Sequence, residues 1–174
     1  MENLKRRPVA LTLVVLGALA RLVPHPPNFA PVGGMSLFAG ARLRGWQAYM
    51  VPILLMAITD PLLGGFGMAT PFVYASFLIN VWMGQRFLRG SEGPVRIGLA
   101  AVISSVQFFV ISNFGVWVGS YPHTWAGLTS CYIAAIPFYS RTLLSDLLYS
   151  GVLFGAHAVL SRTVSTRERV AQAA

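Results

Sequence analysis

The sequence predicts an all-α, multi-pass membrane protein with about six transmembrane helices, forming a single integral membrane domain over residues 1–174. The composition is the first observation, because 55% of the residues are hydrophobic and only 10% are charged, against about 25% in a soluble domain. The second is a series of apolar segments separated by turns. The third is a net charge of +8, carried by basic residues between those segments.

The first apolar segment, residues 8–24, follows the basic residues 5–7 and predicts a membrane helix. A basic start, a short apolar run and Ala-Leu-Ala at residues 18–20 also fit a cleaved signal peptide. Both alternatives stay open at this point, because each places the following residues on the outer side of the membrane.

The second segment, residues 29–41, predicts a short span rich in small residues. The stretch before it cannot form a regular helix because it contains four prolines, namely Pro24, Pro26, Pro27 and Pro31. Small side chains let helices approach closely, and this segment supplies Gly33, Gly34, Gly40 and Ala41.

Three longer apolar segments follow, and each predicts a span: residues 46–63, 70–88 and 95–118. The first of them ends at Asp60-Pro61, before a glycine-rich turn. Residues 126–138 are apolar but short and contain Pro137, so they predict an interfacial or re-entrant helix. Residues 142–160 predict the last span.

The basic residues predict the orientation of these helices. Eleven of the thirteen Lys and Arg residues fall on one side of the predicted membrane. Cytoplasmic loops of membrane proteins carry such an excess, so the amino and carboxyl ends are predicted to be cytoplasmic, in a plasma membrane. The eleven are Lys5, Arg6, Arg7, Arg42, Arg44, Arg86, Arg89, Arg96, Arg162, Arg167 and Arg169.

Polar side chains gather toward the outer half of the predicted bundle, where charges are costly and are candidates for function. We expect a small-molecule site there, lined by nine residues: Arg21, His25, Asn28, Asp60, Asn113, Trp117, Tyr132, Arg141 and Asp146. The alternative is that the two Arg and two Asp residues pair with each other and only stabilise the bundle. The aromatic residues likewise fit either an interfacial belt or a ligand-stacking surface.

Two further patterns lie in the predicted helices. Asp146, Ser150 and His157 share one helical face, which favours a bundle-facing stripe over a proton relay because the first and last lie about 16 Å apart along the axis. The pairs Gly115/Gly119 and Gly151/Gly155 predict tight helix packing.

Several classes of function receive no support from the sequence. It contains no hydrolase, P-loop or dinucleotide-binding motif, so the protein is predicted not to be an enzyme and to need no cofactor. Its one cysteine, Cys131, and the lack of a Cys/His cluster argue against a metal site. Its basic residues follow the pattern of cytoplasmic loops, so no nucleic-acid partner is predicted.

Some longer stretches carry a resemblance: His25–Ala41, Ile58–Pro61, Asn113–Trp117, Tyr132–Phe138 and Asp146–Tyr149. They resemble a family of small, uncharacterised bacterial membrane proteins labelled as transport proteins. That family is similar in size and span number to the S components of energy-coupling-factor transporters, which bind vitamins. The resemblance implies a six-helix bundle that captures a small, vitamin-like molecule from outside. It also implies a transmembrane coupling subunit with ATPases as partner.

The leading hypothesis is therefore a membrane transport protein or the substrate-binding subunit of a transporter. An accessory or structural membrane protein without a substrate is the second hypothesis. The third is a small ion-coupled carrier that uses Asp60 or Asp146 as its proton or cation site. All three place the protein in a lipid bilayer, and none identifies the substrate.

Overall fold

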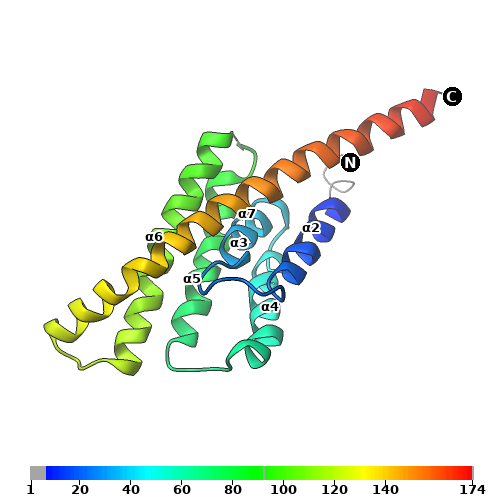
Figure 1. Cartoon of the computed structure of the whole chain (residues 1–174). Coiled ribbons are helices and arrows are strands. Elements are labelled where there is room, and N and C mark those ends of the chain that lie inside the picture. The colour runs from blue at the N-terminus through cyan, green and yellow to red at the C-terminus, as the bar shows by residue number, and fades with distance from the viewer. Residues whose placement is uncertain (1–6, 92, 174) are drawn as a thin grey trace.

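The chain folds into helices, as the all-α prediction expected. The computed structural model describes residues 7–91 and 93–173, with side chains described for residues 8–91 and 93–163. In this part of the chain there are six α-helices, a π-helical segment and no strand (Figure 1). They are α2 (Arg7–Ala20), α3 (Val32–Arg42), α4 (Gln47–Leu63), α5 (Thr70–Met83), η1 (Gly84–Leu88), α6 (Pro94–Ser120) and α7 (Trp125–Ala173).

Helix α3 lies at the centre of the bundle. Every residue from Val32 to Ala41 is buried, and α2, α4, α5, η1, α6 and α7 all pack against it. Its 11 residues rise only about 16 Å, roughly half of the 30 Å hydrocarbon core of a bilayer. The predicted second span is therefore a short inner helix, which begins after the proline-rich stretch at Val32 instead of at residue 29.

Glycines allow the neighbours of α3 to approach its backbone. A side chain at Gly33 would overlap the carboxylate of Asp146, and one at Gly34 would meet the backbone nitrogen of Ser150 at 2.8 Å. Nearer the carboxyl end of α3, a side chain at Gly40 would overlap the carbonyl of Val81 in α5. The predicted close contacts at these three glycines are confirmed.

The connections lie at two ends of the bundle. In Figure 1 the α4–α5 and α6–α7 loops lie at the lower end, and the α5–α6 connection lies at the upper end. At the upper end, the guanidinium of Arg89 donates to the carbonyls of Gly40 and Leu43, at 3.0 and 2.6 Å. It thereby satisfies carbonyl groups that the end of α3 leaves without helical partners.

The structure corrects the number of helices predicted near the carboxyl end of the chain. Residues 126–138 and 142–160 were expected to form two separate helices, but both belong to one helix of 49 residues, Trp125–Ala173 (Figure 1). Pro137 lies inside it and removes a single amide donor. Local hydroxyls reinforce the following turn, since Ser140 donates to the carbonyl of Pro137 and Thr142 to that of Phe138. One missing hydrogen bond does not end a helix that packs along α6.

Among the described residues, two helices are long and apolar enough to cross a membrane, as judged by length and composition. They are α6, over Pro94–Ser120, and the part of α7 over Trp125–Thr163. Pro8–Ala20 and Gln47–Leu63 are also apolar but shorter. Of the basic residues behind the predicted orientation, Lys5 and Arg6 lie outside the described residues, as do the side chains of Arg7, Arg167 and Arg169.

The two GxxxG pairs differ in their surroundings. Gly115 and Gly119 of α6 lie against the side chains of Phe72 and Met68, as tight packing requires. For Gly151 and Gly155 of α7 the prediction was wrong, because a side chain built there would meet no described atom within 4 Å. Spacing alone cannot tell which face of a helix a partner will cover.

Candidate functional site

A cavity of about 360 Å³ lies between α3, α7 and the loop that joins α2 to α3. Its polar lining comes from that loop and from α7, while apolar side chains of α4, α5 and α6 form the other walls. The polar side chains are Arg21, His25, Asn28, Thr142, Ser145 and Asp146. The main apolar ones are Met56, Leu63, Val73, Phe77 and Phe108.

Arg21 follows the last residue of α2 and forms a buried ion pair with Asp60 of α4 across 2.7 Å. The other terminal nitrogen of the guanidinium lies 2.5 Å from the sulfur of Met56. The second carboxylate oxygen of Asp60 accepts a hydrogen bond of 3.0 Å from the hydroxyl of Tyr74. Both oxygens of Asp60 are therefore engaged, and the predicted pairing of at least one aspartate is confirmed.

Asp146 lies on the α7 wall and is only 2% exposed. Its carboxylate occupies the space that a side chain at residue 33 would fill, and the backbone amide of Gly34 donates to it. Its Oδ2 atom has no hydrogen-bond partner among the described residues. Because a buried polar atom is normally hydrogen-bonded, this oxygen is an acceptor that the described residues leave unused.

His25 and Asn28 come from the proline-rich loop. The Nδ1 atom of His25 lies 3.1 Å from the carbonyl of Pro26. A carbonyl oxygen can only accept, so this contact requires the proton on Nδ1 and leaves Nε2 as an acceptor in the neutral ring. Asn28 has a backbone φ of 63°, a conformation that asparagine adopts more readily than most residues. Its turn brings the loop over the cavity.

Asn113 lines a smaller, adjoining cavity of about 150 Å³. The two cavities share Asn28, Val73, Phe108 and Thr142 as lining residues. The Nδ2 of Asn113 donates to the carbonyl of Phe109 at 2.8 Å, which leaves its Oδ1 as an acceptor. The structure thus brings six of the predicted residues to one region: Arg21, His25, Asn28, Asn113 and Asp146 as lining, and Asp60 behind Arg21.

The other three predicted residues lie away from both cavities. The indole of Trp117 donates to the carbonyl of Pro122 at 3.0 Å, and the hydroxyl of Tyr132 donates to that of Val110 at 2.6 Å. The side chain of Arg141 is exposed. All three lie close in sequence to residues of the site. Hydrogen bonds to backbone carbonyls hold the side chains of Trp117 and Tyr132 outside the cavities. Arg141 lies on an exposed face of its helix.

Three polar residues of the site were not among the predicted ones. Thr142 and Ser145 lie four and one residues before Asp146 on α7 and line the cavity; the four-residue spacing places Thr142 on the face of Asp146 and could have indicated it. Tyr74 contacts Asp60 from α5, and no sequence signal connects the two helices.

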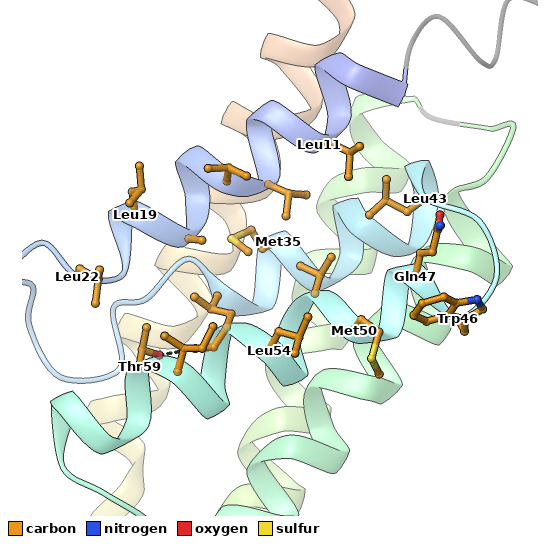
Figure 2. Close-up of a pocket in the computed structure, with 16 residues that line it drawn as sticks. Leu11, Leu19, Leu22, Met35, Leu43, Trp46, Gln47, Met50, Leu54 and Thr59 are labelled. Carbon is orange, nitrogen blue, oxygen red and sulfur yellow. Dashed lines mark hydrogen bonds between the residues drawn. The ribbon is translucent and has the colours of Figure 1, made fainter.

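A second, larger cavity differs in its chemistry. It is a groove of about 530 Å³ between α2 and α4 with Met35 of α3 at its base (Figure 2). Its lining is aliphatic or aromatic apart from Gln47 and Thr59, and the hydroxyl of Thr59 already donates to the carbonyl of Leu55. The groove therefore lacks the charged side chains that would orient a polar molecule. No group of three or more His, Cys, Asp or Glu side chains able to hold a metal ion occurs in the part of the chain described.

The comparisons with known proteins identify a family but no activity. Residues 1–169 match a family of unknown function, DUF6580, and the chain belongs to that family. No curated protein matches the chain, and no solved structure does.

Proposed function

We propose that this protein is a multi-pass protein of the bacterial inner membrane that binds a small molecule from the outer side. It acts as a transport protein or as the substrate-binding subunit of a transporter. The observation that carries this proposal is the 360 Å³ cavity, whose wall includes a buried carboxylate with an unpartnered oxygen. Small-molecule sites combine an apolar cleft of about 300–1,000 Å³ with a few convergent polar groups, as this cavity does.

The exposed surface supports the membrane location. Only 28% of the apolar window of α6 and 33% of that of α7 are buried inside the protein, although the core helix of a soluble protein would be mostly buried. Large apolar side chains are also exposed on α2 and α4, among them Leu16, Leu54 and Ile58. Lipid can cover such a surface without the cost of contact with water.

A six-pass topology accommodates the short central helix. We assign one pass to each of α2, α4, α5 with η1, α6 and α7. The remaining pass consists of α3 together with the non-helical chain before it. Non-helical backbone is tolerated at membrane depth where protein surrounds it, and α3 is enclosed by all of its neighbouring helices.

The orientation of the cavity follows from the charges of the loops. Leu63 lines the cavity next to the α4–α5 loop, which contains no Lys or Arg, and the α6–α7 loop contains none either. The opposite connections carry Arg44 and Arg89, and Arg96 lies in the first turn of α6. By the positive-inside rule the cavity end of the bundle faces outward.

The source of energy for transport has two candidates. A transmembrane coupling subunit with ATPases is the partner that the resemblance to S components implies. A carrier driven by an ion gradient is the second candidate function. Its proton-binding groups would be Asp146 and His157 of α7, which are both buried, at 2% exposure. Intramembrane carboxylates and histidines are common elements of proton pathways.

Native mass spectrometry of the protein purified from its membrane tests the binding function. We expect the wild type and the matched control Arg141→Ala to retain a small metabolite, and Asp146→Asn to lose it while remaining folded. Co-purification of a larger subunit would identify the coupling partner. A folded protein that carries neither metabolite nor partner would instead favour an accessory or structural protein.

Reconstituted vesicles distinguish the two energy sources. An ion-coupled carrier moves its solute into vesicles that contain this protein alone when a proton or sodium gradient is imposed. A binding subunit retains the solute under the same gradient but produces no flux until its partner is added. Flux by the protein alone would therefore exclude dependence on a coupling subunit.

A further inference from the structure

Of the two aspartates at the site, only one has a cationic partner among the described ion pairs. Arg21 is neutralised by its ion pair with Asp60, whereas Asp146 has no cationic partner among the described ion pairs. Arg141, the other cation expected at the site, is exposed and lines neither cavity. With Asp146 ionised, the described groups of the site therefore carry one uncompensated negative charge.

The hydrogen-bonding groups of the cavity are mainly acceptors. The hydroxyl protons of Thr142 and Ser145 are donated to the helix carbonyls of Phe138 and Thr142, at 3.2 and 3.0 Å. A hydroxyl that has donated its proton keeps its lone pairs, so both oxygens can still accept. The Nε2 of His25 and the Oδ2 of Asp146 are acceptors as well. The donors of the cavity are the amide of Asn28 and those N–H groups of Arg21 that do not contact Asp60 or Met56.

The opposite wall is apolar and aromatic. The rings of Phe77 and Phe108 stack with centroids 5.0 Å apart and an interplanar angle of 30°, and both line the cavity. Such a wall can contact the flat or aliphatic part of a solute. An aromatic face also attracts a nearby cation.

We infer that the cavity selects a solute with a protonated amine or a similar cationic N–H donor. The N–H groups bind the carboxylate of Asp146 and the hydroxyl oxygens of Thr142 and Ser145, and the apolar part of the solute lies against Phe77 and Phe108. This inference rests on the proposed binding function and adds the chemical class of the solute. A carboxylate or phosphate would instead meet unpaired acceptors, which repel it.

Three probes with the same ring and different charge test this inference: benzylamine, benzyl alcohol and benzoate. Their affinities are measured at neutral pH by saturation-transfer NMR on the full chain in lipid nanodiscs. We expect benzylamine to bind at least about tenfold more tightly than benzyl alcohol, because a charge-assisted hydrogen bond is stronger than a neutral one. We expect benzoate to bind most weakly.

Variants connect the preference to the cavity. Asp146→Asn should lower the affinity for benzylamine about tenfold and leave that for benzyl alcohol unchanged, since it removes the charge but keeps the shape. If Asp146→Asn does not fold, Ser145→Ala should lower the benzylamine affinity several-fold, because it removes one acceptor. Arg141→Ala should change none of the three affinities.

The outcomes separate this inference from the proposed function. If benzoate binds most tightly, the inference is overturned and the binding function remains. The same holds if benzylamine binds equally well to the wild type and to a folded Asp146→Asn or Ser145→Ala variant. If no probe binds but a metabolite co-purifies, a cationic metabolite supports the inference and an anionic one overturns it. If no probe binds and no metabolite co-purifies, the proposed function itself fails.

Discussion

Arg21, Asp60 and Tyr74 form a polar cluster and come from three separate elements. Arg21 and Asp60 are about 10% exposed at their side chains and lie 2.7 Å apart. Tyr74 occupies the remaining carboxylate oxygen. A buried pair of this kind gains little over two apolar residues, but removal of one partner leaves an uncompensated buried charge.

We therefore predict that Arg21→Ala lowers the free energy of unfolding by about 3 kcal/mol. The matched control, Arg141→Ala, should change it by no more than about 0.5 kcal/mol, because that side chain is exposed. The double variant Arg21→Met/Asp60→Leu should recover much of the loss. Reversible unfolding in mixed detergent micelles measures all three, and equal losses for the two single Arg variants would contradict the prediction.

Gly33 and Gly151 offer a matched pair for the α3–α7 contact. Gly33→Ala places a methyl group into the carboxylate of Asp146, so we predict a loss of about 1–3 kcal/mol in unfolding free energy and weaker solute binding. Gly151→Ala meets no described atom within 4 Å and should be neutral or stabilise the helix by up to about 1 kcal/mol. Comparable destabilisation by both changes would show that the close approach of α3 and α7 is not the cause.

At the scale of elements, α3 is a short helix that depends on its surroundings. Ten of its eleven residues are buried, and its last carbonyls are satisfied from outside by Arg89. A cation at the carboxyl end of a helix also interacts favourably with the helix dipole. In the sequence, Arg89 was one of several basic residues from which the orientation was predicted. In the structure it also donates hydrogen bonds at the carboxyl end of α3.

Arg89→Ala is accordingly expected to destabilise the protein by about 1 kcal/mol, because it removes charge-assisted hydrogen bonds to Gly40 and Leu43. Arg44→Ala removes the same charge from an exposed position on the same side and should leave stability unchanged. Thermal unfolding of both variants in the same detergent distinguishes the two roles. If the two variants lose the same stability, the effect belongs to the charge and not to the contact with α3.

At the scale of the whole molecule, the question is how many helices cross the membrane. Within the described part of the chain, only α6 and part of α7 are long and apolar enough by themselves, while the proposed topology has six passes. The two arrangements differ in the side on which the α4–α5 loop emerges. With six passes this loop shares a side with the α6–α7 loop, whereas with two passes it shares a side with the α5–α6 connection.

Cysteine labelling can settle this point. In a Cys131→Ala background, we predict that Phe66→Cys and Trp125→Cys react with a membrane-impermeant maleimide from outside intact cells. Gly93→Cys should react only after the membrane is opened. All three positions are exposed, so accessibility does not differ between them. The six-pass topology would be refuted if Phe66→Cys and Gly93→Cys were labelled on one side of the membrane and Trp125→Cys on the other.

Local patterns in the sequence were sufficient to predict the helices. Apolar runs, prolines and glycines act within a few residues of their own position, so the all-α fold and the break before α3 followed directly. The same reasoning failed at Pro137. A proline removes one hydrogen bond and its ring crowds the preceding turn, but the packing of a long helix against α6 offsets this cost.

Contacts between distant segments could not be read from the sequence in the same way. Asp60 and Asp146 look alike as aspartates in apolar helices, yet one is paired with Arg21 and Tyr74. The other lines a cavity and has a buried oxygen without a described partner. The spacing of polar residues along the sequence was enough to predict near which helix ends they lie. Which of them meet, and which acid is left without a cationic partner, depends on how α2, α4, α5 and α7 pack around α3, because side-chain pairing is a property of three-dimensional distance.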